Sequence, residues 1–221
     1  MKVLRIAAIA AATCAAIAAP AQAQETGSYV GLSLGRSTLH IDEAANNAAL
    51  NAEGIGHRGF TSDEQDSAWK IYGGYRFNRH FAIEGGLLSL GAFSTSTVLT
   101  SLNGVPVTPG TLSVTGKTKE GIHAAGLGIL PIGEQAHVFG RLGVYSIKSE
   151  GEAVASGPAG TFSMSSSDRT SDLILGLGAG YEFTKNFGVR AEWERYKKVG
   201  DEDTLGQGDV DVLSIGAVYR F

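Results

Sequence analysis

The sequence predicts an all-β fold, an eight-stranded antiparallel up-and-down transmembrane β-barrel. Three observations support it. Residues 213–221 alternate strictly between an apolar and a mixed face, as in a strand that has one face in lipid. The connections between the expected strands alternate between short and long. No apolar stretch after Ala23 reaches the ~18 residues that a membrane helix needs, whereas barrel strands cross a bilayer with only half of their residues apolar.

The eight strands are expected at approximately residues 28–36, 68–77, 80–90, 119–130, 137–148, 171–183, 187–197 and 210–221. The tight connections are residues 78–79, 131–136 and 184–186. The long connections are residues 37–67, 91–118, 149–170 and 198–209. Because barrels of this kind have short periplasmic turns and long extracellular loops, we expect both termini on the periplasmic side and four long loops outside the cell.

The long segments carry turn signals of their own. Asn103-Gly104 indicates a type I′ hairpin, and the Gly157-Pro158-Ala159-Gly160 segment marks another reversal. We therefore expect the flanking strands to extend above the membrane as ribbons. Residues 42–52 are rich in Ala and Asn after an acidic start, which favours a short helix.

The N-terminal residues have the pattern of a secretory signal. Lys2 and Arg5 precede an apolar run, and Ala21-Gln22-Ala23 is an A-x-A cleavage site. We expect residues 1–23 to be a cleaved signal peptide and residues 24–221 to form one barrel domain. Cys14 lies in the cleaved segment, and a lipoprotein site there fits less well than the A-x-A site. Loss of Lys2 and Arg5 would shift the net charge from −4 to −6, which argues against a nucleic-acid partner.

Aromatic residues cluster beside the short turns and predict an interfacial girdle. Trp69 lies eight residues before Phe77, which is roughly 19 Å at ~3.3 Å per residue and a tilt of ~45°, so Trp69 and Trp193 would mark the opposite interface. The expected girdle on the turn side consists of Tyr75, Phe77, Phe81, Tyr181, Phe183, Phe187, Tyr219 and Phe221.

Charged residues on the opposite parity should face the barrel interior, which side chains fill in eight-stranded barrels. The expected inward charges are Lys70, Arg76, Glu84, Arg141, Asp172, Glu182, Arg190, Glu192, Glu194 and Arg220. Glu84, Arg141, Arg190 and Glu192 reach comparable heights and would form a network, with Lys70 and Glu194 beside it. The network would be a structural plug or, alternatively, a gate whose ion pairs switch partners. Phe139 shares the parity of Arg141, so it either points into the lumen or marks a bulge.

The whole expected mature chain resembles the eight-stranded transmembrane domain of the outer-membrane protein A-like porin family. The resembling segments are 29–35 (YVGLSLG), 73–78 (GGYRFN), 81–86 (FAIEGG), 178–183 (GAGYEF) and 189–193 (VRAEW), in this order and spacing. The resemblance implies insertion in the outer membrane of a Gram-negative cell, a lumen of paired charges and, at most, narrow conductance. The chain departs from full-length members by ending at the barrel, so their periplasmic peptidoglycan-binding domain is not implied.

The last five residues (AVYRF, 217–221) also resemble the C-terminal signature of outer-membrane barrels. That resemblance implies that Tyr219 and Phe221 are read by the barrel assembly machinery. The other expected partners are outer-membrane lipids and lipopolysaccharide, an unknown ligand of the loops, and no nucleic acid. We expect a monomer with no cofactor and no metal.

Four functions remain open from the sequence. The first is a structural or narrow porin-like barrel, and the second is an adhesion barrel that binds host or matrix components through its long loops. The third is a lipid A-modifying enzyme, which we do not expect because His123, the one His well within a strand, has no Ser nearby. The fourth is a soluble periplasmic β protein, which the C-terminal strand and the girdle oppose. The acidic run Asp201-Glu202-Asp203 with Asp209 would hold a divalent cation, bridge lipopolysaccharide or be a solvated tip, and it lacks the spacing of a calcium loop.

Overall fold

The computed structural model describes residues 26–40, 55–63, 65–102, 105–158, 160–201 and 206–221. The expected signal peptide and the expected helix at residues 42–52 lie outside these ranges. No helix long and apolar enough to cross a membrane occurs among the described residues.

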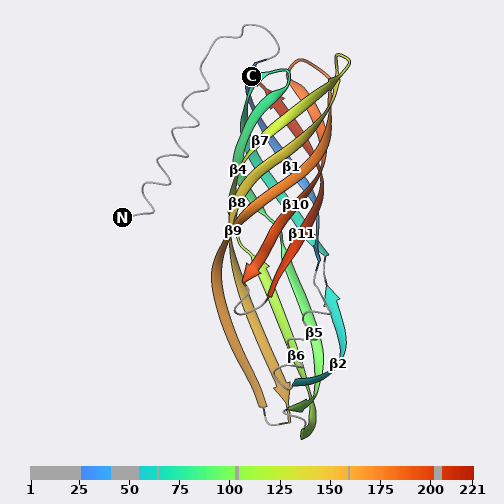
Figure 1. Ribbon diagram of the computed structural model, residues 1–221, viewed down its shortest axis with the longest axis vertical. Coiled ribbons are helices and arrows are strands. Elements are labelled where there is room, and N and C mark those ends of the chain that lie inside the picture. The colour runs from blue at the N-terminus through green and yellow to red at the C-terminus, as the bar shows by residue number, and fades with distance from the viewer. Residues whose placement is uncertain (1–25, 41–54, 64, 103–104, 159, 202–205) are drawn as a thin grey trace, which may run out of the picture.

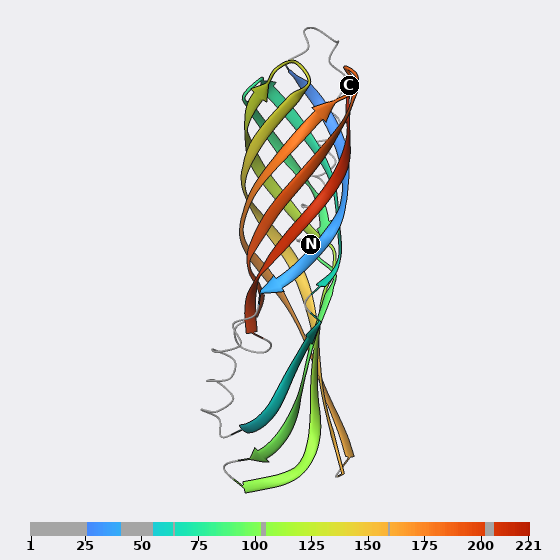
Figure 2. The ribbon, with the colours of Figure 1, turned by 90° about the vertical axis from the view of Figure 1, so that its right-hand side faces the viewer.

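The described residues form an antiparallel sheet, and eight of its strands close into a ring (Figures 1 and 2). The order around the ring is β8-β7-β4-β3-β1-β11-β10-β9, and β9 pairs again with β8. The ring strands are β1 (Gly27–His40), β3 (Gln65–Asn78), β4 (Phe81–Ser89), β7 (Gly121–Ile132), β8 (Ala136–Gly157), β9 (Gly160–Glu182), β10 (Phe187–Asp201) and β11 (Gly206–Arg220).

The first and last strands of the ring complete it. β1 and β11 pair without a register shift from Tyr29 opposite Arg220 to His40 opposite Asp209. The backbone N–H of Phe221 also donates to the carbonyl of Ser28 at 3.1 Å. Closure leaves the ring without an unpaired strand edge, which is the condition for a sheet to cross a bilayer.

Side-chain alternation explains why these segments form a barrel wall. In β7, Ile122 and Leu130 are exposed on the outside, whereas His123 and Leu127 between them are buried in the lumen. The other ring strands alternate in the same way, so large apolar side chains cover the outer surface. Strands with an apolar outer face and a filled interior suit a lipid environment.

The same sheet continues beyond one side of the ring. β8 and β9 remain paired beyond the ring as far as Gly157 and Gly160. The remaining strands, β2 (Ile55–Asp63), β5 (Ala92–Leu102) and β6 (Val105–Thr118), add to the outer part of β8. The result is a projecting sheet in the order β2-β5-β6-β8-β9, which stands away from the long-loop end of the ring (Figure 2).

The eight predicted ring strands are confirmed, and the long segments differ from expectation in one respect. Both ribbons form, because β5 pairs with β6 and β8 pairs with β9 where the turn signals were found, although Asn103, Gly104 and Ala159 lie outside the described residues. β2 differs from the prediction, since the sequence predicts a loop over residues 37–67. The sequence of β2 has no clean alternation, and its pairing with β5 contains two register shifts.

Candidate functional site

The centre of the lumen holds six charged residues from four strands. Because side chains alternate between the two faces of a strand, Lys70 of β3, Glu84 of β4 and Arg141 of β8 point inward. Arg190, Glu192 and Glu194 occupy every second position of β10 and also point inward. Each of the six is 5% exposed or less. These are the six residues named from the sequence as the lumen charge network, and the fold brings all of them together.

The pairing among these residues is dense. Arg141 contacts all three carboxylates, with its Nη2 on Glu84, its Nη2 3.0 Å from Glu192 and its Nη1 2.9 Å from Glu194. Lys70 Nζ bridges Glu192 at 2.9 Å and Glu194 at 2.8 Å. Arg190 Nη1 lies 2.5 Å from the remaining oxygen of Glu84. We call these six residues the charge network.

The charge network contains as many cations as carboxylates. Lys70, Arg141 and Arg190 balance Glu84, Glu192 and Glu194, so the cluster is formally neutral. Neutrality is required because an unpaired ion in a dry interior costs several kcal/mol, and removing one partner of a buried pair typically costs about 3–5 kcal/mol. Each ion of the charge network is therefore stable in the lumen only while its partners are present.

Polar and aromatic neighbours complete the charge network. Tyr29 donates its hydroxyl proton to Glu84 at 2.7 Å, and Tyr196 donates to Glu194 at 3.3 Å. The guanidinium carbon of Arg190 lies 4.4 Å from the ring centre of Phe139 and 5.1 Å from that of Tyr72. Cations over aromatic faces gain further attraction when they are desolvated. The sequence analysis did not identify Tyr29, Tyr72 and Tyr196. Their parity was the available signal, because Tyr72 and Tyr196 lie two residues from the inward charges Lys70 and Glu194. Tyr29 lies opposite the inward Arg220 on the neighbouring strand.

The position of Phe139 resolves the question raised by its parity. Phe139 is 4% exposed and points into the lumen, and β8 pairs with β7 and β9 without a register shift around it. The ring fits because Gly178 lies opposite it on β9, where a Cβ would be 2.2 Å from Phe139 Cζ. A bulge is therefore absent at this point, and a glycine on the neighbouring strand makes the room.

Apolar layers enclose the charge network on both sides. On the short-turn side, the network borders buried residues that include Tyr72, Leu127 and Val218. On the long-loop side it borders a larger layer, in which Ile147, Ile174 and Val210 are 0% exposed. We call this larger layer the upper apolar layer, where upper means toward the long loops, which point downward in Figures 1 and 2. Its buried members are Ala68, Leu88, Leu90, Phe93, Tyr145, Ile147, Ile174, Tyr196, Val199, Val210 and Val212.

The other inward charges lie apart from the charge network. Arg220 pairs with Glu182 at 2.5 Å near the short turns, and Arg76 donates to the carbonyl of Asn78 at 3.2 Å. Asp172 accepts the backbone N–H of Leu173 at 2.6 Å on the long-loop side. These four residues share the predicted parity, and their positions along the strands keep them out of the central cluster.

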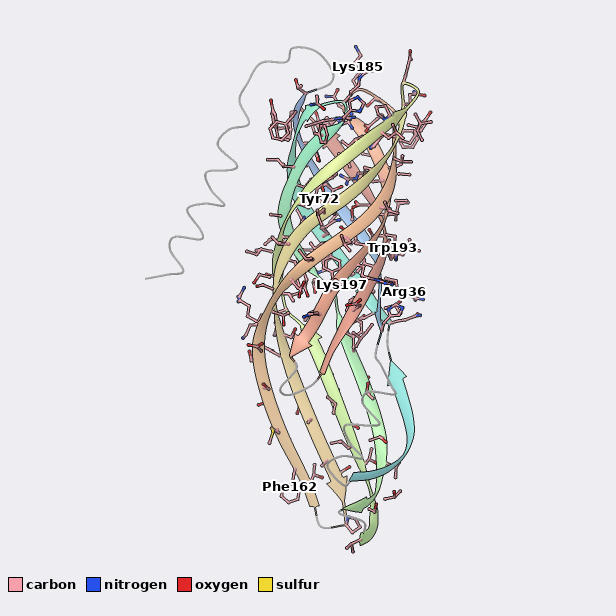
Figure 3. All side chains as sticks on the ribbon, viewed as in Figure 1. Arg36, Tyr72, Phe162, Lys185, Trp193 and Lys197 are labelled. Carbon is pink, nitrogen blue, oxygen red and sulfur yellow. The ribbon has the colours of Figure 1, made fainter. Side chains whose placement is uncertain are left out.

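The predicted girdle residues on the turn side are all between 41% and 60% exposed on the outer surface. Neighbours along or across the strands contact each other, with ring centres 5.2 Å apart for Tyr75 and Phe77 and 5.4 Å apart for Tyr219 and Phe221. Trp193 is 38% exposed on the barrel wall (Figure 3), and Trp69 is half-buried. The signal role of Tyr219 and Phe221 in assembly stays a prediction.

Ion pairs on the outer surface begin above Trp193. Arg195 stacks on Trp193, with 5.4 Å between its guanidinium carbon and the ring centre, and donates to Asp211 at 2.6 Å. Lys197 pairs with Asp209 at 2.5 Å. Asp209 thus has a cation partner, while Glu202 and Asp203 of the expected acidic run lie outside the described residues.

One further cluster lies where the projecting sheet leaves the ring. Glu150 of β8 accepts from Lys119 at 3.2 Å and from Lys148 at 3.3 Å. The hydrogen bond from Lys119 and then that from Lys148 lower the pKa of the Glu150 carboxyl. Across the β8–β9 pairing, Lys148 lies directly opposite Arg169, so two cations face each other.

The described histidines are distributed along the molecule. His123 is buried in the lumen, His137 Nδ1 lies 3.8 Å from Glu182, and His40 Nε2 lies 3.8 Å from Asp211. Nδ1 of His80 lies 3.2 Å from the Ile129 carbonyl. Among the described residues, no serine is hydrogen-bonded to a histidine, and no group of three or more potential metal ligands was found.

Comparison with known proteins agrees with this architecture. The model of the outer membrane protein beta-barrel domain family matches residues 7–221. The chain belongs to this family. Membership makes it a β-barrel of the Gram-negative outer membrane, in agreement with the closed ring, the lipid-suited outer face and the resemblance found in the sequence.

Two relatives named outer membrane protein A are similar in sequence. The protein from Serratia marcescens is 27% identical over 217 residues, which covers 97% of this chain and 54% of the relative. The protein from Yersinia pseudotuberculosis serotype I is 31% identical over 103 residues, which covers 46% of this chain and 29% of the relative. The chain therefore spans about half the length, or less, of the relatives that it matches.

Two solved structures are similar in shape. Ail, the attachment invasion locus protein of Yersinia pestis, has a TM-score of 0.47 and 18% identity, covering 88% of this chain and 99% of Ail. The outer membrane protein OprG from Pseudomonas aeruginosa has a TM-score of 0.45 and 14% identity, covering 90% of this chain and 99% of OprG.

Proposed function

We propose that this chain is a structural outer-membrane barrel with a sealed lumen. The observation that carries this proposal is the upper apolar layer, which fills the barrel above the charge network. A gate would need a water path that opens when ion pairs exchange partners. Here a rearrangement of Arg141 or Glu84 would still meet Tyr145, Ile147 and Ile174, which are 2% exposed or less. The charge network is thus a plug that fixes the barrel interior.

Single-channel recording on the purified protein in planar bilayers tests the seal. We expect no steady conductance from the wild type, with a known open porin in the same bilayers as the positive control. Arg141→Ala removes the central cation but leaves the upper apolar layer intact, so it should also stay closed. Steady openings of the wild type, or a rise in conductance in Arg141→Ala, would mean that the charge network is a gate.

We also propose that the short-turn end faces the periplasm and that the projecting sheet faces the outside of the cell. The alternation of short turns and long connections supports this orientation. An epitope inserted near Phe162, at the far end of the projecting sheet (Figure 3), should then bind antibody on intact cells. An epitope inserted at Lys185 should bind antibody only after the outer membrane is opened, and the reverse pattern would contradict the orientation.

Lipopolysaccharide is the proposed lipid partner of the outer leaflet. Lys148 lies twelve residues beyond Ala136, which at ~3.3 Å per residue and a tilt of ~45° is a height of roughly 28 Å and thus just above an apolar band of ~25 Å. Lys119 and Arg169 are its neighbours, so cations gather at the expected height of the headgroups. Replacing Lys148 and Arg169 with Gln should weaken retention of lipopolysaccharide on the purified barrel, compared with the same change at Lys185.

An interaction role is the second candidate, and the projecting sheet favours it. Phe162 and Met164 are 71% and 76% exposed, although they lie beyond the height of the apolar band. Ala155 and Ala153 lie opposite them on β8. Exposed apolar patches outside a membrane are typical of binding surfaces. We propose that this face contacts host or matrix proteins.

Binding of intact cells to host cells and to matrix tests the interaction role. Phe162→Ser with Met164→Ser should reduce binding, while Ser163→Ala with Ser165→Ala on the opposite face serves as the matched control. Equal binding by both variants and the wild type would count against this surface. An enzymatic role is not proposed, because the described histidines contact carboxylates or a carbonyl, or lie buried in the lumen, without a serine partner.

A further inference from the structure

The projecting sheet has two edges, formed by β9 on one side and by β2 on the other (Figure 1). β10 pairs with β9 only as far as Ile174, so beyond that point β9 is paired on one side, by β8. Among the described residues, no strand pairs with the other side of β9 between Gly160 and Ser167. This part of β9 therefore presents backbone N–H and C=O groups along an open edge.

The open edge of β9 lacks the features that normally prevent edge strands from pairing. Charged side chains, prolines and bulges block such edges. Residues 160–167 (GTFSMSSS) contain no charge and no proline, and β8 and β9 pair over this range without a register shift. β2 differs, because it contains Arg58 and Asp63 and its pairing with β5 has two register shifts. Of these two edges, the β9 edge is therefore the better template for another strand.

The sequence of this edge is self-complementary in one antiparallel register. When two copies pair about Ser163, each Ser163 lies opposite its own copy, and Phe162 of each chain lies opposite Met164 of the other. Phe162 and Met164 are 71% and 76% exposed, so the pairing brings two exposed apolar side chains together twice. Sulfur–aromatic contacts are favourable, and cross-strand pairs of this kind stabilise sheets. Thr161 likewise meets Ser165, which pairs two hydroxyl side chains.

The direction of the projecting sheet determines where the second copy must lie. The sheet continues along the long axis of the barrel (Figures 1 and 2). Antiparallel pairing needs a partner whose β9 runs the opposite way, whereas copies in one membrane all point the same way. An antiparallel pair about Ser163 therefore joins two barrels in facing membranes, through a two-fold axis perpendicular to the strands.

We propose that the outer edge of β9 pairs with the same edge of a second copy on a neighbouring cell, and that this pairing makes the cells adhere to one another. The proposal rests on the orientation proposed above, which places the projecting sheet outside the cell. Each contact involves residues 160–166 of both chains and is weak by itself. Many copies on two facing surfaces act together, because each further contact forms at a high effective concentration.

Mixing of cells tests the pairing, because a charge at position 163 meets its own copy in this register. Wild-type cells of a strain with short lipopolysaccharide should aggregate and settle. Ser163→Lys should abolish aggregation, because like charges directly opposite each other are unfavourable, and Ser163→Glu should do the same. A mixture of these two populations, each with its own fluorescent label, should form aggregates that contain both labels.

Ser156→Lys and Ser156→Glu are the matched controls. Ser156 lies near the same tip on β8, which is paired on both sides, with Thr111 and with Thr161. These variants should aggregate like the wild type. Their dispersal would mean a general effect of charge at the tip and would overturn the proposal. Aggregation of Ser163→Lys cells alone, or no recovery in the mixture, would also overturn it, as would wild-type cells that bind host cells but not each other.

A cysteine at position 163 tests the register and the membrane in which the partner lies. Antiparallel partners have Cα atoms ~4.5–5.5 Å apart, within the range that a disulfide bridges. Two populations of Ser163→Cys cells that carry different epitopes should yield a disulfide-linked dimer that contains both epitopes, whereas Ser156→Cys should not. Dimers that contain one epitope only would mean contact within one membrane and would reject pairing between cells.

A maleimide that cannot cross the outer membrane separates this proposal from the orientation on which it rests. It is applied to dilute, reduced Ser163→Cys cells. Labelling of intact cells, without aggregation of wild-type cells and without the two-epitope dimer, would reject the pairing and leave the orientation intact. Labelling only after the outer membrane is opened would reject the orientation and the pairing together.

Discussion

Arg141 is the residue on which the lumen depends most. Among the described residues, it is the one guanidinium that reaches Glu84, Glu192 and Glu194 together. Its replacement would leave more negative than positive charge in an interior that water does not reach. The charge network therefore contributes to stability through interdependence, since each carboxylate is tolerable only while its cation is present.

Arg141→Ala should destabilise the barrel by about 3–5 kcal/mol, because carboxylates stay buried with too few partners. Urea unfolding in detergent measures the change. Lys148→Ala is the control, since its pair with Glu150 is more than two fifths exposed on both sides and such pairs contribute ~0–1 kcal/mol. Equal losses in the two variants would mean that the inward face of β8 is assigned wrongly.

Glycine positions decide how large side chains fit in the same lumen. A Cβ on Gly178 would lie 2.2 Å from the Phe139 ring, whereas a Cβ on Gly128 has no atom within 4 Å. Gly178→Ala should therefore cost about 1–3 kcal/mol through overpacking. Gly128→Ala, on the lipid face, should be close to neutral. The difference between the two urea midpoints measures the effect, and equal midpoints would mean that Phe139 moves aside at little cost.

Glu150 provides a residue-scale test outside the membrane. Hydrogen bonds from Lys119 and Lys148 lower the pKa of its carboxyl, so it should titrate below the ordinary value of about 4.3. Because the folded-state pKa is depressed, the stabilising effect is present above the ordinary pKa and is lost as the pH falls through the folded-state pKa. Lys119→Met with Lys148→Met should raise the pKa, as measured by NMR of the labelled carboxyl; an unchanged pKa would contradict the pairing.

At the scale of elements, β8 and β9 belong to two structures at once. The parts of β8 and β9 near the short turns pair within the ring. On the long-loop side, β8 and β9 continue into the projecting sheet, which also contains β6, β5 and β2. The ring strands bury their inner face against the filled lumen, whereas the outer part of β9 exposes residues on both of its faces. We therefore expect the barrel to depend on the ring parts of β8 and β9 and much less on their outer parts.

Deletion of residues 151–166 should leave the ring intact, because Glu150 and Ser167 are paired and can be joined by a short turn. The shortened protein should keep its heat-modifiable electrophoretic mobility, since all pairings within the ring remain. A deletion of the same length within β9 of the ring should abolish that mobility. Loss of the folded form after the first deletion would mean that the projecting sheet is needed for assembly.

At the scale of the whole molecule, the seam between β1 and β11 joins the two ends of the chain. Antiparallel partners have Cα atoms ~4.5–5.5 Å apart, within the range that a disulfide bridges. In a Cys14→Ser background, Leu32→Cys with Ala217→Cys should crosslink under mild oxidation, because these residues are partners. Non-reducing electrophoresis of the boiled protein shows the crosslink.

The matched control for the seam is Leu32→Cys with Ile215→Cys, which is displaced by two residues along β11. It should crosslink much less. Crosslinking of the displaced pair in preference to the partner pair would mean that the seam has a different register. A register shift of two residues would leave the inward charges of β11 on the inner face, whereas a shift by an odd number of residues would move them to the outer face.

The amino-acid sequence was sufficient to predict the ring of eight strands, because the alternation of apolar and polar residues repeats within each strand and turn signals separate the strands. It also placed Lys70, Glu84, Arg141, Arg190, Glu192 and Glu194 on the inner face, since parity follows from the strand period. The tertiary structure sets which of these ions pair, because the height of a residue in a tilted barrel depends on the register of every strand between them. It alone revealed the upper apolar layer, whose members come from distant strands and look locally like ordinary barrel residues. It alone assembled β2, β5 and β6 onto β8, because pairing between ribbons is set by long-range hydrogen bonding that no local pattern encodes.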